Sequence, residues 1–234
     1  MNDMSSAPVP DRTPDSVLQT WRKALTQPSE QTFVEIASRP EAKATTAYLW
    51  VFVASLIQIF LVGLVQSQLL GTYGDQLGLG EQFGPRSGFG AILVSALCAA
   101  PIGAALNTLF FAIGVFVIQW IAKMFGGIGT TERLTYAVGA IVAPYILISG
   151  VGSLFSAIPY VGWCITTIFA LAGLYIIVLE IMAVKGVNQI SWGAAIGSVL
   201  IPGLVIAFLC ACLIGVSIAF LLPVIQETAP NFSP

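Results

Sequence analysis

The chain repeatedly carries stretches of roughly 20 apolar residues, and this pattern restricts its fold more than any other feature. A helix of that length crosses about 30 Å of hydrocarbon. Of the 234 residues, 57% are apolar and only 9% are charged, whereas a soluble domain is about 25% charged. Helices satisfy their own backbone hydrogen bonds in lipid, and continuous apolar runs exclude an alternating outer-membrane barrel. The sequence therefore predicts an all-α, polytopic transmembrane helical bundle.

The apolar runs indicate five spans within a transmembrane domain at 46–223. A tail at 1–14, rich in Pro and small polar residues, is predicted to be disordered. Segment 15–45 is predicted to form short amphipathic helices on the cytoplasmic side, and 224–234 an exoplasmic tail. The expected spans are about 47–65, 102–122, 134–157, 161–184 and 200–222.

The apolar stretch at 89–122 is too long for one ordinary span and too short for two with a turn. We interpret 89–100 as an interfacial or re-entrant lead-in helix that is interrupted at Pro101 before the second span. One long, kinked helix is the alternative. Ser191 and Trp192 similarly open a lead-in to the fifth span, which has Pro202 near its start.

The basic residues orient this bundle. With the N-terminus inside, eight of the nine Lys and Arg residues fall on the cytoplasmic side, and Arg86 alone falls outside. The eight are Arg12, Arg22, Lys23, Arg39, Lys43, Lys123, Arg133 and Lys185. The positive-inside rule then predicts a cytoplasmic N-terminus and an exoplasmic C-terminus.

The segment before the first span offers candidate contacts with partners. Trp21, Arg22, Lys23 and Phe33 suit an interfacial helix or a surface for another membrane or cytoplasmic protein. The alternative is that these helices dock on the cytoplasmic ends of the spans. Gly126, Gly127 and Gly129 predict a tight turn between two spans, and without a P-loop Lys-Ser/Thr they do not indicate a phosphate site.

One ionisable residue, Glu180, lies well inside a predicted span. Intramembrane carboxylates often mark ion paths, so a small transporter or channel using Glu180 is the alternative function. The simpler interpretation places Glu180 near the cytoplasmic end, within reach of headgroups or Arg133. The small-residue pair Gly193 and Gly197 is the best candidate for contact with another subunit in a homo- or hetero-oligomer.

The sequence does not indicate enzymatic, metal-binding or nucleic-acid-binding chemistry. The chain has no His, no paired carboxylates and no nucleophile beside a base, so we expect no enzyme, no metal and no cofactor. No basic block suggests nucleic acid. The four Cys residues lie in or beside apolar runs and are expected to pack as small apolar side chains.

Three stretches resemble the Yip1 domain family of five-span membrane proteins, and together the likeness covers roughly residues 17–222. The stretches are Trp21-x3-Leu25-Thr26-x-Pro28 with Phe33, then Met124 to Thr130 leading into Tyr136 and Ala143-Pro144-Tyr145, and finally Ile158 to Trp163 continuing through Leu174-Tyr175 to Val187. The resemblance implies the same topology as the charge pattern.

In eukaryotes the family is associated with Rab GTPases, vesicle traffic and the shaping of Golgi and ER membranes. Those members carry an Asp-Leu-Tyr-Gly-Pro-like segment before the first span, and nothing similar precedes Ala47. The chain looks more like the prokaryotic branch. The resemblance therefore implies a non-enzymatic scaffold, adaptor or accessory subunit in a prokaryotic inner or plasma membrane, with a Golgi or ER membrane as the alternative.

Overall fold

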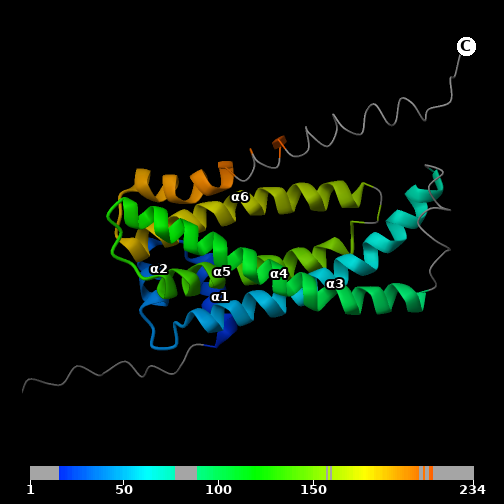
Figure 1. Ribbon diagram of the computed structural model, residues 1–234, viewed down its shortest axis with the longest axis horizontal. Helices are drawn as coiled ribbons and strands as arrows, with labels where there is room; N and C mark the ends of the chain where they lie inside the picture. Colours follow the sequence, from blue (N-terminus) through cyan, green and yellow to red (C-terminus); the bar gives the residue numbers. More distant parts are fainter. Residues whose placement is uncertain are drawn as a thin grey trace, which may run out of the picture.

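The protein is a bundle of long helices, seen in a computed structural model that describes residues 16–76, 89–156, 158, 160–205, 208, 211 and 212. No strand occurs among these residues. The helices are α1 (Val17–Thr26), α2 (Glu30–Ala37), α3 (Ala44–Gln76), α4 (Phe89–Met124), α5 (Thr131–Ser153) and α6 (Val161–Asn188), followed by an apolar helix at Trp192–Val205 (Figure 1).

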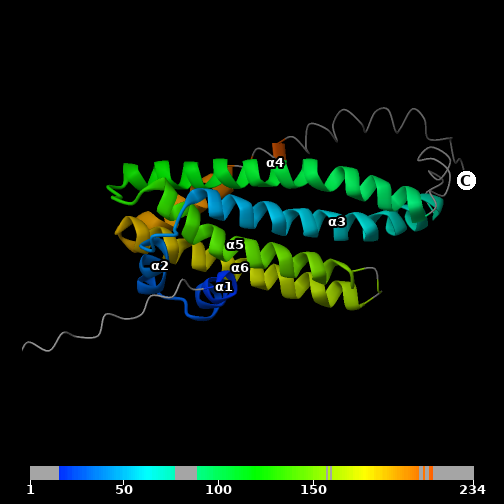
Figure 2. The same ribbon diagram turned by 90° about the horizontal axis from the view of Figure 1, so that it is seen from below.

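The long helices form two antiparallel pairs, α3 with α4 and α5 with α6, which lie against one another as two layers (Figure 2). Helix α3 packs on both α4 and α5. Within the described part of the chain, four stretches are long and apolar enough to cross a membrane: Ala44–Val65, Leu93–Met124, Thr131–Ser153 and Val161–Asn188. The predicted all-helical membrane bundle is therefore confirmed. The predicted tails and most of the predicted fifth span lie outside the described residues.

The predicted break at Pro101 is wrong. Helix α4 runs without interruption from Phe89 to Met124 with Pro101 inside it, so 89–100 is not a separate lead-in helix. Proline removes one backbone hydrogen bond, but a helix in lipid has no better alternative conformation, and neighbouring helices support it. Likewise, the helix at Trp192–Val205 continues through Pro202.

Small and polar residues let α3 approach its neighbours closely. A Cβ added at Gly139 would lie 2.7 Å from Cβ of Ala47, and one at Gly150 would lie 2.8 Å from Cα of Gln58. Gln58 also donates a 3.0 Å hydrogen bond to Ser149 of α5, and Asn107 of α4 donates one of 2.7 Å to Ser55. Close backbones and hydrogen bonds between helices stabilise a bundle in lipid, where the hydrophobic effect contributes little.

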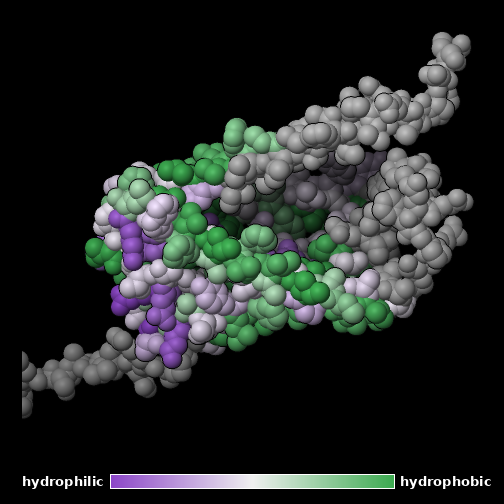
Figure 3. Space-filling model, viewed as in Figure 1, coloured by the Kyte–Doolittle hydropathy of each residue, from purple (hydrophilic) through white to green (hydrophobic). Residues whose placement is uncertain are grey.

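One end of the bundle, here called the polar end, gathers most of the described charges. It comprises α1, α2, the starts of α3 and α5, and the ends of α4 and α6, and Figure 3 shows the hydrophilic surface concentrated there. All seven described basic residues belong to it: Arg22, Lys23, Arg39, Lys43, Lys123, Arg133 and Lys185. The 36 residues of α4 measure about 54 Å, more than the hydrocarbon needs, so part of the bundle lies outside the hydrocarbon.

Candidate functional site: the polar end

Helix α1 lies across the flank of the bundle near the polar end. Ser16 caps it in a capping box with Gln19. Near its middle, the Trp21 ring meets the Trp50 ring of α3 edge-on, with centroids 5.9 Å apart. Toward its end, the Leu25 carbonyl accepts a 2.8 Å hydrogen bond from the Tyr175 hydroxyl of α6. The helix therefore bridges α3 and α6 rather than standing free of the bundle.

Helix α2 crosses α6 at close range. Ser29 caps α2, and its side chain accepts a hydrogen bond from the Thr32 backbone. A Cβ at Gly186 would lie 2.8 Å from the Glu30 carbonyl oxygen, so glycine permits this crossing. The next residue, Lys185, forms an ion pair with Glu30, and its ammonium lies 4.6 Å from the ring centroid of Trp192. Lys185 thus joins α2, α6 and the following helix.

A second charge cluster joins α1 to α2. Glu35 accepts a 2.6 Å hydrogen bond from Lys23 and lies 3.6 Å from Arg39. Arg39 also donates a 3.0 Å bond to the Thr20 hydroxyl. The hydrogen bond from Lys23 is the main reason that the pKa of Glu35 is below its ordinary value, against a smaller opposing effect of burial.

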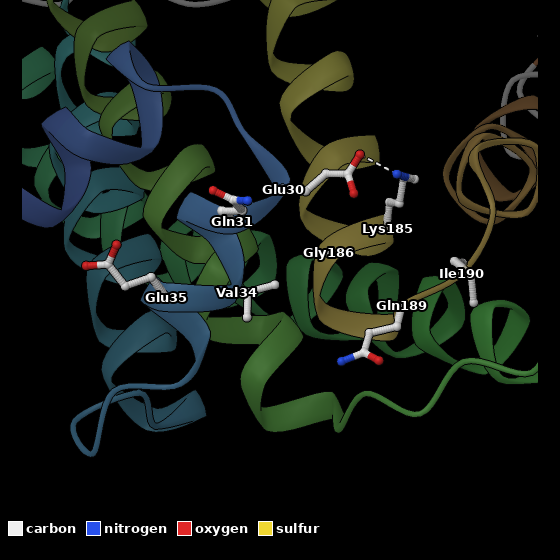
Figure 4. A pocket seen from close by; sticks show the side chains of 8 residues that line it. All are labelled: Glu30, Gln31, Val34, Glu35, Lys185, Gly186, Gln189 and Ile190. Carbon is white, nitrogen blue, oxygen red and sulfur yellow. Dashed lines mark hydrogen bonds and ion pairs between the residues drawn. The ribbon is translucent and has the colours of Figure 1, made fainter.

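Between α2 and the end of α6 lies an open groove of about 520 Å³ (Figure 4). We call it the α2–α6 groove; it is lined by Glu30, Gln31, Val34, Glu35, Lys185, Gly186, Gln189 and Ile190. Its walls combine charged ends, two carboxamides and apolar side chains. Such a surface can offer hydrogen bonds and an apolar contact to a protein segment, which is typical of a polar interface rather than of a catalytic centre.

The predicted glycine turn connects α4 to α5 and packs on the end of α6. Gly126 has a φ of +86°, a conformation that other residues rarely adopt. Gly127 N–H donates to the Ala122 carbonyl at 2.9 Å, and Ile128 N–H donates to the Asn188 carbonyl at 3.1 Å. At Gly129 a Cβ would lie 2.6 Å from Oδ1 of Asn188. The turn therefore needs glycine for close packing as well as for conformation.

The predicted partner residues have different surroundings. Phe33 is completely buried in the core, so its predicted contact with a partner is wrong: its ring packs within the chain. Trp21 is half-buried against Trp50, and Lys23 is held by Glu35. Arg22 is exposed and forms no ion pair with any other described residue. Helices α1 and α2 dock on the spans, in agreement with the alternative interpretation of this segment.

Glu180 and Arg133 are not brought together. Glu180 is half-buried on α6, Arg133 is exposed on α5, and neither forms an ion pair within the described part of the chain. Glu180 precedes Asn188, the last residue of α6, by eight residues, or about 12 Å. It lies between Tyr175, which contacts α1, and Lys185, which contacts α2. Glu180 is therefore level with the N-terminal helices.

The sequence did not predict the side chains that link these elements. It marks Lys185 only as one of the basic residues on the cytoplasmic side, and it does not single out Gln119 or Asn188. A Lys-Gly pair at the end of an apolar run is a signal of close helix crossing, because glycine admits a neighbouring backbone there. The Gln119–Asn188 pairing, 69 residues apart, has no local signal.

Comparison with known proteins agrees with the resemblance noted in the sequence. The family model described as the Yip1 domain matches residues 22–214. No curated protein and no solved structure matches the chain. The matched region includes the second half of α1, all of α2 to α6 and the helix at Trp192–Val205, which together form the bundle and its polar end. The chain belongs to the Yip1 domain family.

Proposed function

We propose that the protein is a non-enzymatic membrane scaffold or adaptor that binds a partner protein at its polar end, in the α2–α6 groove. The bundle anchors this end to the bilayer, with the N-terminus in the cytoplasm and the C-terminus outside. The membrane we propose is the inner or plasma membrane of a prokaryote. The single observation that carries the proposal is the groove itself, open to solvent and built from two helices that are firmly connected.

The rigidity of the groove supports a docking role. Its α2 wall is fixed by the buried side chains of Phe33 and Ile36 and by the Glu30–Lys185 ion pair. On that wall, Gln31 and Val34 remain exposed. A preformed surface binds with less loss of conformational entropy than one that must become ordered on binding. The partner surface therefore includes Gln31, Val34 and Gln189 rather than Phe33.

The test places a charge in the groove. The full chain in detergent is used to capture proteins from its own cell membranes and cytoplasm, with and without Val34→Glu. Val34 is 42% exposed, so this substitution is compatible with folding. Leu18→Glu is the matched control, because Leu18 is an exposed apolar residue of α1 outside the groove. We expect the specific partner to be lost with Val34→Glu and retained with Leu18→Glu.

Equal capture by both variants would refute the groove as the docking surface. Flux measurements separate the scaffold from a transporter. Purified protein in sealed vesicles should carry no flux of protons or small cations above that of protein-free vesicles. Robust flux that Glu180→Gln abolishes would contradict the scaffold and support a transport function.

A further inference from the structure

The exposed face of α4 is apolar over most of its length. Large apolar residues recur on it at intervals of three or four positions, as one face of a helix requires. They are Ile102, Leu106, Leu109, Ile113, Phe116 and Trp120, each between 49% and 67% exposed. We call this row the α4 stripe, and it extends over about 27 Å. No charged residue occurs in α4 before Lys123, so nothing on this face resembles a surface in water.

Near the level where the α4 stripe ends, the opposite face of the bundle is charged. Helices α4 and α6 both run toward the polar end, and the hydrogen bond between Gln119 and Asn188 places these residues side by side. Phe116 and Lys185, three residues before them, are therefore level with one another. Lys185 forms its ion pair with Glu30 of α2, and Figure 2 shows α1 and α2 on the face opposite α4. At this one level, an exposed aromatic ring on one face corresponds to an ion pair on the other.

Charges on the face formed by α1 begin still further from the polar end. The Leu25 carbonyl of α1 accepts the hydrogen bond from Tyr175, which precedes Lys185 by ten residues, or about 15 Å of α6. Arg22, about one turn before Leu25, is exposed. A charged side chain within the hydrocarbon is costly, and an arginine can extend toward the headgroups only by its own length. On this face the hydrocarbon therefore ends near the level of Tyr175.

Lipid is the occupant that fits the α4 stripe. The stripe lies within a stretch that is apolar enough to cross a membrane, and it continues to Trp120, shortly before Lys123. A Trp followed by a Lys at the end of an apolar run is typical of the boundary between hydrocarbon and headgroups. The helix at Trp192–Val205 does not cover the stripe at this level. A Cβ at its Gly197 would lie 3.7 Å from the ring of Phe125, which is two and a half turns after Phe116 and so on the other side of α4.

We propose that the cytoplasmic boundary of the hydrocarbon crosses the bundle obliquely. Lipid acyl chains cover the α4 stripe as far as Trp120, whereas the face formed by α1 and α2 leaves the hydrocarbon at the level of Tyr175. From Tyr175 to the level of Phe116 the difference is about 15 Å, half of a hydrocarbon thickness of about 30 Å. The proposal concerns lipid contact and does not rest on partner binding. It places the α2–α6 groove in water at a level where α4 is still in lipid.

The test compares the two faces at one level by spin labelling. The full-length protein, with its four native cysteines replaced by Ala, receives a single nitroxide at Phe116→Cys or Gln31→Cys. Gln31 is exposed and follows Glu30, the partner of Lys185. In phosphatidylcholine–phosphatidylglycerol vesicles, collisions of the label are measured with oxygen, which concentrates in hydrocarbon, and with a water-soluble nickel chelate. The exposed positions Leu106→Cys and Ile128→Cys are the controls for lipid and for water.

We expect the ratio of oxygen to nickel collisions to be several-fold higher at Phe116→Cys than at Gln31→Cys. The first should resemble Leu106→Cys, and the second Ile128→Cys. Equal ratios at the two positions, whether high or low, would overturn the oblique boundary. A label at Phe116→Cys that neither reagent reaches would also overturn it, because a second copy or another protein would then cover the stripe. Thermal unfolding of each variant in detergent, compared with the cysteine-free parent, shows that the fold is retained.

Discussion

The side-chain amide of Gln119 donates a 2.8 Å hydrogen bond to Oδ1 of Asn188, and this contact ties the end of α4 to the end of α6. The same amide donates to the Gly129 carbonyl at 2.8 Å. Both side chains are buried, so the pair holds the glycine turn against α6 from within the polar end.

Gly129→Ala should destabilise the protein by about 1–3 kcal/mol, because the new methyl group would overlap Asn188 Oδ1 and the Val187 carbonyl oxygen, 2.6 and 2.8 Å away. Gly114→Ala is the control, since its Cβ meets nothing within 4 Å, and it should stabilise the helix by about 0.5–1 kcal/mol. Thermal unfolding in detergent measures both. A Gly129→Ala protein as stable as wild type would contradict the close packing of the turn.

Gln119→Leu should cost about 1–3 kcal/mol, because it leaves the Asn188 and Gly129 oxygens buried without their donor. Gln31→Leu, at an exposed position, should change the free energy of unfolding by less than about 0.5 kcal/mol. The two free energies can be compared by denaturant titration in one detergent. Similar small effects at both positions would mean that the buried network contributes little.

Lys185→Met should loosen α2, because it removes the ion pair with Glu30 and leaves that carboxylate without its partner. Hydrogen exchange at the amides of residues 30–37 should become faster, by roughly tenfold if the pair contributes about 1.4 kcal/mol to docking. Lys123→Met is the control, since Lys123 is exposed and forms no ion pair with another described residue. Unchanged exchange in α2 would show that apolar packing alone holds it.

The stability of the α1–α2 pairing should decline in acid. The pKa of Glu35 is lowered in the folded protein, so its contribution is complete above its unfolded pKa of about 4.3 and is lost as the pH falls through the lower folded value. The carboxylate is 56% exposed, so the effect should be below about 1 kcal/mol. Unfolding of wild type and Glu35→Gln between pH 6 and 3 should therefore converge at the acid end. If the stabilities of the two proteins instead fall in parallel over this pH range, Glu35 is not the cause of the loss in acid.

The polar end should face the cytoplasm. In a background without native cysteines, Tyr160→Cys should react with a membrane-impermeant maleimide on intact cells, whereas Ile128→Cys should react only after lysis. Both positions are exposed, at opposite ends of the bundle. A reporter fused after Pro234 should be active only outside. The reverse labelling pattern would invert the orientation. If the labelling is as expected, a cytoplasmic reporter would exclude an odd number of spans.

The coarse architecture could be predicted from the sequence because it depends on local composition. Apolar runs identify the long helices, and the clustering of Lys and Arg matches the polar end. The continuity of α4 was not predictable with the same rules. In water, proline is a strong signal that a helix is broken, but in this bundle the helix around Pro101 is maintained by its neighbours.

The surroundings of individual side chains could not be predicted, because they depend on contacts between distant residues. The apolar stripe containing Phe33 suits a lipid surface or a protein core equally well, and only the position of α2 on α5 and α6 decides between them. The Glu30–Lys185 pair joins residues 155 apart. Glu180 was assigned a partner from its depth along the span, which does not determine the direction in which a side chain points.

Helix α5 is enclosed far more than its neighbours. In its most apolar stretch, 67% of the residues are buried, against 11% for α4 and 22% for α3 and α6. It also contains Pro144 and Gly139 and has the lowest hydropathy of the four, 1.8. A helix of this kind gains little from lipid alone and much from packing on α3 and α6. Helix α3 is the main neighbour of α5 and precedes it in the chain, so during biosynthesis α5 should settle in the bilayer against an α3 that is already in place.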